Sequence, residues 1–153
     1  MKLSEVKKDC KRIYPIGSFS TMGDTKMKTI KTVRAIAAAD GRRILVANVE
    51  SMNPHTGHKK DMFGIFDALA VDGKTFRGLQ ACGTDWNEHV QKLKENIETC
   101  RRWLAPGNST IELWGWRRVK RRGQKVFRPR VQVITLGYLQ GTEPGKPTEI
   151  FED

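Results

Sequence analysis

The chain has no apolar run long enough to cross a bilayer, which takes about 18 residues. Its N-terminal stretch is polar and basic, and it has no apolar core of the kind that a signal peptide carries. Hydrophobic residues nevertheless make up 38% of the 153 residues, which is typical of a folded protein rather than a disordered one. We therefore expect one intracellular, cytoplasmic domain that is large enough to bury a core.

Cysteine is scarce and badly placed for cross-links. Cys10, Cys82 and Cys100 are odd in number, lie far apart and form no CxxC pair. This pattern supports neither a disulfide framework nor a zinc ribbon. His55 and His58 lie close together, but no cysteine pair accompanies them and their segment contains proline and glycine. We interpret that segment as a solvated loop rather than a zinc site.

Acidic residues are few relative to basic ones. The chain has 17 Asp and Glu against 28 Lys and Arg, which leaves a formal net charge of +11. Such an excess favours association with polyanions, nucleic acid first and an anionic membrane surface second. A merely basic protein without such a partner is the plain alternative.

The positive charge is concentrated in a segment that contains no acid between Glu112 and Arg130. Arginine forks match phosphate oxygens, and each neutralised phosphate releases counterions, so we predict that a hairpin over 114–130 binds nucleic acid. Trp114 and Trp116 share one strand face, and we expect them to pack in the core rather than stack on bases. The predicted nucleic-acid-binding residues are Arg117, Arg118, Lys120, Arg121, Arg122, Lys125, Arg128 and Arg130.

Hydrophobic periodicity and turn residues divide the chain into helices and strands. The order is helix, three strands, helix, two strands, which predicts an α/β fold with a mixed β-sheet flanked by helices. Residues 1–24 are expected to be a basic arm or short helix, and 140–153 a tail, around a domain of 25–139. The expected elements are a helix over 24–38, strands over 43–50, 62–71 and 76–83, a helix over 85–104 with Asp85 and Glu88 as its capping box, and strands over 110–119 and 127–139.

Two polar residues interrupt the apolar strands on either side of the Asp72-Gly73 turn. They are Asp67 in the first strand and Gln80 in the second. A carboxylate that is buried without a partner costs several kcal/mol, so Asp67 needs a cation, a hydrogen-bond network or solvent. Paired across a hairpin, Asp67 and Gln80 would jointly present oxygen ligands to a hard metal ion.

The order of elements and the positions of these two residues resemble the PD-(D/E)XK nuclease superfamily, particularly its small phage and Holliday-junction-resolvase-like members. The core of that family is a helix, a three-stranded meander, a helix and a strand. Its second strand carries an Asp, and its third carries a Glu or Gln, one residue, then a Lys. Asp67 and Gln80 match the first two positions, whereas the lysine position falls on Cys82, which cannot supply a positive charge.

The resemblance covers roughly Thr25 to Leu136 and implies a restriction-endonuclease-like sheet of about five strands. It implies a Mg²⁺- or Mn²⁺-dependent endonuclease that hydrolyses DNA phosphodiester bonds, with branched or phage-processing DNA as one class of substrate. Asp67, the side-chain carbonyl of Gln80 and a backbone carbonyl near Ala81 would hold the metal.

The missing lysine is expected from the following helix, because in this superfamily it can move to a neighbouring element. Lys94 lies on the flank of the buried stripe, whereas Lys92 is expected to point further toward solvent, so we prefer Lys94. Glu50 is either an accessory acid or a surface carboxylate at the end of a strand. Asp61 lies six residues before Asp67, a distance of roughly 20 Å in an extended strand, so we expect it to be structural rather than a shared ligand.

The implied partner is nucleic acid, DNA rather than RNA, in the cytoplasm of a prokaryote or a phage-infected host, without a membrane. A homodimer is one option, because resolvases act as symmetric pairs. The alternative is a non-catalytic nucleic-acid-binding protein on a degenerate nuclease fold, which Cys82 and Gln80 both favour. A third option, an RNA-associated basic protein of unrelated fold, would leave Asp67 without a role.

Overall fold

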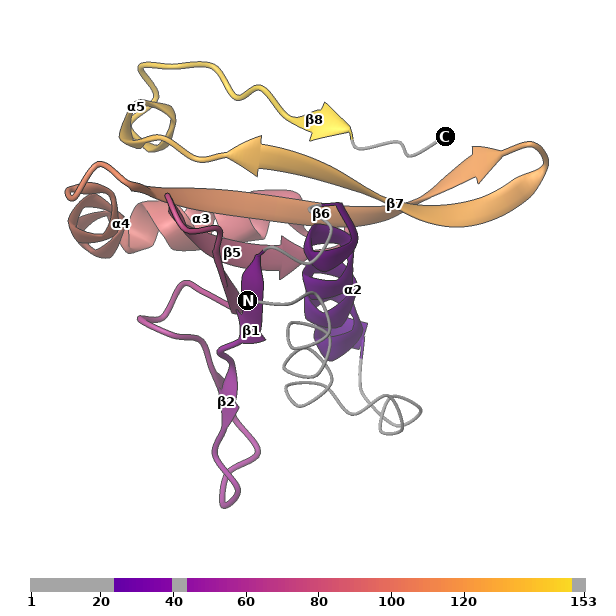
Figure 1. Cartoon of the computed structure of the whole chain (residues 1–153), viewed down its shortest axis with the longest axis horizontal. Helices are drawn as coiled ribbons and strands as arrows, with labels where there is room; N and C mark the ends of the chain where they lie inside the picture. Colours follow the sequence, from indigo (N-terminus) through magenta and orange to yellow (C-terminus); the bar gives the residue numbers. More distant parts are fainter. Residues whose placement is uncertain (1–23, 40–43, 150–153) are drawn as a thin grey trace.

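A computed structural model of the chain describes residues 24–39 and 44–149, so Cys10 and all of the predicted N-terminal segment except Asp24 lie outside the described residues. The elements follow one another with short connections (Figure 1). In chain order they are α2 (Asp24–Ala39), β1 (Leu45–Asn48), β2 (Ser51–Met52), β3 (Lys59–Lys60), β4 (Ala68–Val71), β5 (Phe76–Cys82), α3 (Trp86–Glu95), α4 (Ile97–Leu104), β6 (Ser109–Arg121), β7 (Gln124–Val133), α5 (Leu136–Leu139) and β8 (Thr148–Glu149).

One mixed sheet organises the described residues, and its strand order is β1-β4-β5-β6-β7-β8. Neighbouring strands are antiparallel except for β5 and β6, which are parallel and are connected through α3 and α4. A parallel pair needs such a crossover connection, since a tight turn can join only antiparallel strands. The predicted α/β class with a mixed sheet is therefore confirmed.

The helices cover opposite faces of the sheet, and each face has its own hydrophobic cluster. On one face Val33 and Ile36 of α2 pack against Leu79, Trp114 and other sheet residues. On the other face α3 and α4 form a cluster with apolar residues of β5 and β6, among them Cys82. Alternate residues of a strand point to opposite faces, so each central strand contributes to both clusters. None of the helices in the described residues is long and apolar enough to span a membrane.

The predicted hairpin around Asp72-Gly73 is present as β4 and β5. The Asp72 carboxylate accepts hydrogen bonds from the backbone N–H groups of Lys74 and Thr75 at 2.9 and 2.8 Å and from the Thr75 hydroxyl at 2.7 Å. Gly73 has a φ of +89°, a conformation that glycine adopts without strain. These local bonds explain why so short a segment determines the turn.

The second predicted helix differs from its expectation in two ways. It is interrupted at Asn96, whose side-chain amide donates to the carbonyl of Lys92 at 2.8 Å and competes with the helical pattern. The predicted capping box is wrong, because Asp85 makes no side-chain cap hydrogen bond. Instead its carboxylate accepts from the backbone N–H of Gly83 at 2.9 Å and pairs with His89 at 3.1 Å.

Two segments predicted to lack regular structure contain short strands. Residues 51–60 form a hairpin from β2 and β3 rather than an open loop. In the predicted C-terminal tail, Thr148 and Glu149 pair with β7 through backbone groups, which needs no apolar side chains. The last long strand was predicted to continue to residue 139, but β7 ends at Val133. The chain then forms α5, whose N-cap is Thr135.

Candidate active site

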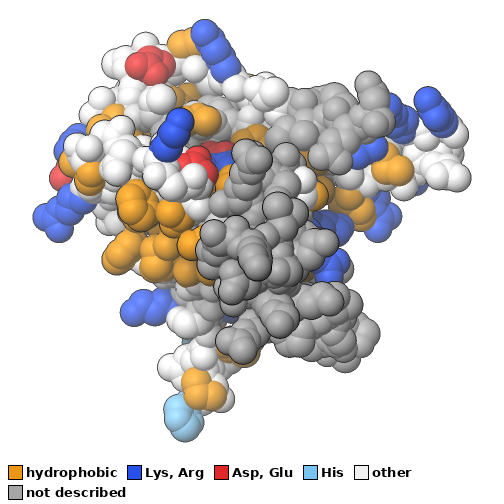
Figure 2. Space-filling view, viewed as in Figure 1, with side chains coloured by type: hydrophobic (Ala, Val, Ile, Leu, Met, Phe, Trp, Pro, Cys, Tyr) orange, Lys and Arg blue, Asp and Glu red, His pale blue; other side chains and the backbone are white. Residues whose placement is uncertain are grey.

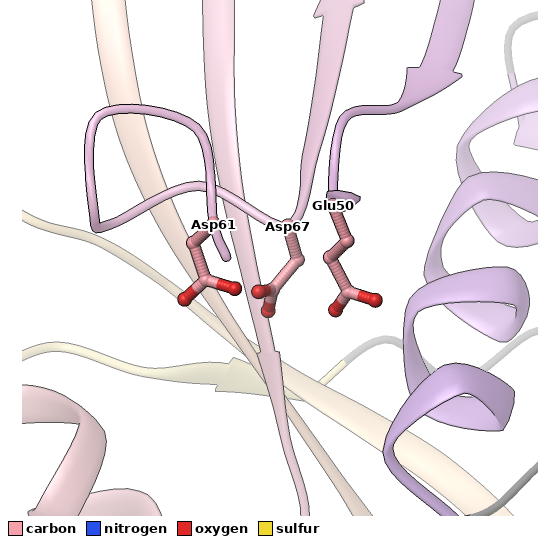
Figure 3. Close-up of side chains that lie close together, drawn as sticks. All are labelled: Glu50, Asp61 and Asp67. Atoms are coloured by element: carbon pink, nitrogen blue, oxygen red, sulfur yellow. The ribbon is translucent and has the colours of Figure 1, made fainter. Parts of the chain in front are cut away.

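Three carboxylates from three separate segments converge at one end of the sheet (Figure 3). Glu50 follows β1, Asp61 follows β3, and Asp67 directly precedes β4. One carboxylate oxygen of each residue lies within 4.8 Å of the other two, and in Figure 3 the side chains point in the same direction. Such a group of oxygens is the donor set that hard divalent cations prefer.

Asp61 belongs to this group, so the expected separation of roughly 20 Å from Asp67 is wrong. The chain between them is a tight turn rather than an extended strand. The N–H of Met62 donates to the carbonyl of Phe66 at 2.9 Å, and the N–H of Phe66 donates back at 3.0 Å. Gly64 in the turn has a φ of +75°. The turn folds the segment back on itself and brings Asp61 beside Asp67.

Asp67 is the most buried of the three, with an exposed fraction of 4%. Its carboxylate accepts a hydrogen bond from the backbone N–H of Ala81 at 2.8 Å and shares another with Asp61. Burial, followed by the negative charge of Asp61, raises the pKa of Asp67 to about 8. Without a bound cation Asp67 therefore holds a proton at neutral pH.

Glu50 offers a carboxylate oxygen that is not yet used. One oxygen accepts a hydrogen bond from the hydroxyl of Thr29 at 3.1 Å, which anchors the side chain to α2. The other oxygen is buried and has no hydrogen-bond partner among the described residues. A buried acceptor without a donor is costly, and a cation would satisfy it. Of the two sequence interpretations of Glu50, this geometry favours the accessory acid.

Gln80 lies across the hairpin from Asp67, as the sequence predicted. Ala68 pairs with Leu79, and the N–H of Asp67 donates to the carbonyl of Leu79 at 2.9 Å, which aligns Asp67 with Gln80. The Gln80 side chain is fully buried, and neither its nitrogen nor its oxygen has a partner within residues 24–39 and 44–149. Metal ligation by Gln80 and by the carbonyl of Ala81 stays a prediction.

A lysine contacts the acidic group, but it is not the expected one. Lys92 forms an ion pair with Asp61, whereas Lys94 is exposed on α3. The expectation that Lys92 points further toward solvent is therefore wrong. The turn that follows Asp61 packs against the helices, and the ring centroids of Phe66 in this turn and Trp103 in α4 lie 4.7 Å apart. A helical wheel cannot show that another segment covers one flank of the helix.

A second cation lies beside Cys82, the position at which the resemblance described above predicts a lysine. The amine of Lys28 lies 2.7 Å from the position that a Cβ atom on Gly83 would occupy. Gly83 directly follows Cys82. Burial raises the pKa of the Cys82 thiol to about 12, so the thiol is neutral, and the positive charge of Lys28 acts in the opposite direction. Lys28 was not among the predicted site residues, because the packing of α2 on the sheet brings it beside Gly83.

The basic hairpin extends beyond the rest of the sheet as a two-stranded arm, whose exposed end lies at the right of Figure 2. We call residues 116–129 the arm. Its turn has positive φ at Arg122 (48°) and Gly123 (80°). Arg118 and Lys31 both lie over the ring of Phe127, at 5.0 and 3.5 Å from its centroid. Five of the predicted binding residues are exposed, namely Arg117, Arg118, Lys120, Arg122 and Lys125, and three are partly buried, namely Arg121, Arg128 and Arg130.

The two tryptophans at the root of the arm pack in the core, which confirms that prediction. Trp114 and Trp116 are 3% and 8% exposed, and their rings lie 6.5 Å apart. The indole N–H of Trp116 donates to Thr32 at 2.8 Å. Arg130 is also held in place, because its guanidinium stacks at 4.0 Å over the ring of Trp86.

The chain matches no protein-family model, no curated protein and no solved structure.

Proposed function

We propose that this protein is a Mg²⁺- or Mn²⁺-dependent endonuclease that hydrolyses phosphodiester bonds in DNA. The observation that carries the proposal is the convergence of Glu50, Asp61 and Asp67 at one end of the sheet, with the basic arm leaving the same sheet. Carboxylates that gather at one point repel each other unless a proton or a cation offsets their charge, and the arm offers positive charge for a polyanion.

The residues fit a divalent cation by chemistry and by spacing. Opposite oxygen ligands of Mg²⁺ lie roughly 4 Å apart, since each bond is about 2.0–2.1 Å, and the three carboxylate oxygens lie within 4.8 Å of one another. Glu50 and Asp61 are partly exposed, which leaves access for a substrate phosphate and water. Glu50, Asp61 and Asp67 would hold the ion, with the Gln80 side-chain carbonyl and the backbone carbonyl near Ala81 as further candidate ligands.

The topology supports a restriction-endonuclease-like fold within the mixed sheet. A helix, α2, precedes the meander β1-β4-β5, and the helices α3 and α4 lead to β6, which is parallel to β5. This is the element order that the resemblance to PD-(D/E)XK nucleases implies. Asp67 directly precedes the second strand of that meander and Gln80 lies on the third, and these are the strands on which the family motif has its Asp and its Glu or Gln.

Hydrolysis joins a water oxygen to phosphorus and releases a sugar oxygen, which takes up a proton. A bound metal would acidify the water and neutralise charge that develops on the phosphate. Lys28 is the cation that we assign to the role of the family lysine, because its amine lies beside Cys82 and Gly83. It would orient the attacking water or stabilise the phosphate. Lys92 holds Asp61 through an ion pair and thereby positions one ligand.

One observation favours the second candidate function, a DNA-binding protein that does not cleave. Cys82, a neutral buried thiol, stands where the family motif has lysine. If Lys28 does not replace that lysine, the site would bind a metal and DNA without efficient hydrolysis.

The deciding experiment incubates the protein with labelled linear duplex, single-stranded and four-way-junction DNA in Mg²⁺, Mn²⁺ or EDTA. We expect metal-dependent cleavage that is lost in Asp67→Asn and retained in Asp72→Asn, a matched change of an exposed carboxylate. Binding without cleavage under every metal would establish the second candidate. Cleavage that survives Asp67→Asn would show that the three carboxylates are not the active site.

A further inference from the structure

The segment between two of the proposed metal ligands is an exposed hairpin that we call the finger, residues 51–60. Glu50 directly precedes it and Asp61 directly follows it. All residues of the finger are exposed, and in Figure 1 it projects away from the body of the protein. Figure 2 shows a histidine side chain at its tip. The finger therefore adds nothing to the hydrophobic core.

The finger is held together by its own hydrogen bonds. The N–H of Asn53 donates to the carbonyl of His58 at 2.9 Å, and the N–H of Gly57 donates to the carbonyl of Asn53 at 2.9 Å. The Asn53 side chain accepts from the N–H of His55, also at 2.9 Å. An isolated two-stranded hairpin is only marginally stable in water. Stability of the fold therefore does not explain this element.

The side chains of the finger suit a polyanion. Lys59 and Lys60 occupy β3, His55 and His58 lie in the turn, and no acidic residue is present in the segment. Ser51 and Met52 on β2 complete the base of the hairpin. A lipid surface would need a larger apolar area than the one exposed methionine on these strands provides.

The finger and the arm leave the sheet at the same end. Strand β1 is antiparallel to β4, β4 is antiparallel to β5, and β5 is parallel to β6, so β1 and β6 run in the same direction. Their three strand spacings amount to roughly 14 Å. Sheet twist of about 20–25° per strand makes the two projections diverge, as Figure 1 shows. The acidic group lies at the base of the finger, beyond the C-terminal end of β1 and the N-terminal end of β4.

We propose that the finger enters a groove of double-stranded DNA while the scissile phosphate lies at Glu50, Asp61 and Asp67. This inference rests on the proposed function and names duplex DNA as the substrate class. Each strand of the finger extends about four residues from base to tip, or roughly 13 Å. The major groove is about 12 Å wide and 8.5 Å deep and admits a two-stranded ribbon. The finger sets where the duplex lies relative to the ligands at its base.

The first test compares Lys59→Ala/Lys60→Ala with a matched control, Lys74→Ala/Lys146→Ala, which removes two exposed lysines outside the finger. Binding of a fluorescent duplex and a single strand is measured by anisotropy in EDTA over a range of salt concentrations. We expect the finger variant to bind duplex DNA about tenfold more weakly than the control does. The number of counterions released on duplex binding, read from the slope of log affinity against log salt concentration, should fall by about two. Both variants should bind the single strand with equal affinity. Equal behaviour of the two variants on duplex, or an equal loss on the single strand, would overturn the inference.

The second test shortens the finger and leaves its base intact. Met52 and Lys59 are paired, so residues 53–58 can be replaced by an Asn-Gly turn, which suits a two-residue hairpin loop. We expect the preference for duplex over single strand to fall about tenfold while the melting temperature is unchanged. An unchanged preference refutes groove entry by the tip.

Cleavage assays run beside these binding assays keep the two proposals separate. Cleavage lost in Asp67→Asn, together with a finger variant that matches its control, would support the nuclease and refute the finger inference. Absence of wild-type cleavage, together with weaker duplex binding by the finger variant, would refute the nuclease and support the finger as a DNA contact.

Discussion

Replacing Asp67 by Asn tests the electrostatics of the site through stability alone. Asp67 is 4% exposed and faces the carboxylates of Asp61 and Glu50, while Lys92 is paired with Asp61. Burial and the charge of Asp61 raise the pKa of Asp67 from 3.8 to about 8. The folded protein therefore holds a proton between pH 4 and pH 8 that the unfolded chain has released.

The sign and size of the effect depend on this difference in bound protons. The contribution of Asp67 to stability is fully present below about pH 4 and is lost as pH rises through about 8. The free energy of unfolding falls by about 1.4 kcal/mol per pH unit in this window, and by about 2 kcal/mol from pH 6 to pH 8, where titration is partly complete. For a protein of this size, that change lowers the melting temperature by about 4–8 °C. Asn does not titrate, so Asp67→Asn removes this decrease.

The assay is thermal unfolding in EDTA at pH 6 and pH 8, followed by circular dichroism, for wild type, Asp67→Asn and Asp72→Asn. Hydrogen bonds to Thr75 and Lys74 lower the pKa of Asp72 to about 2, so Asp72 is ionised throughout and its variant should behave like wild type. Millimolar Mg²⁺ should stabilise wild type at pH 8 but not Asp67→Asn, because the metal binds the ionised carboxylates. If wild type and Asp67→Asn lose the same stability from pH 6 to pH 8, Asp67 is already ionised and burial does not control its protonation.

Three further changes test other parts of the structure. Lys28→Ala should lower the cleavage rate about 100-fold with little change in DNA affinity. The control Lys94→Ala, on the exposed side of α3, should leave the rate unchanged, and equal rates for the two variants would show that Lys28 takes no part in cleavage. Arg122→Ala at the tip of the arm should lower the number of counterions released on DNA binding by about one. An unchanged slope of log affinity against log salt concentration would exclude a phosphate contact at Arg122. Gly78→Ala should destabilise the fold by about 1–3 kcal/mol in urea unfolding, because the new methyl group would overlap the ring of Phe66; a stable variant would contradict that packing.

The main local elements and one pair of site residues follow from the amino-acid sequence alone. Hydrophobic periodicity predicted α2 and the five longer strands β1, β4, β5, β6 and β7, because the face on which a side chain lies depends on the local backbone repeat. The Asp72-Gly73 turn predicted the β4–β5 hairpin, and the hairpin aligns Asp67 with Gln80. These features need only interactions between residues that are close in the chain, so the sequence contains them directly.

Which charged groups meet at the site depends on packing between segments that are distant in sequence. Asp61 lies beside Asp67 because the turn between them folds back. Lys28 belongs to α2, which is distant from Gly83 in the sequence but packs on the sheet beside it. Lys92, and not Lys94, contacts the acidic group because the turn that begins at Asp61 lies on the Lys92 side of α3. Periodicity predicts which face of an element is apolar, but not which segment packs beside it. The acidic group and its lysines depend on that packing, so no local pattern in the sequence could specify them.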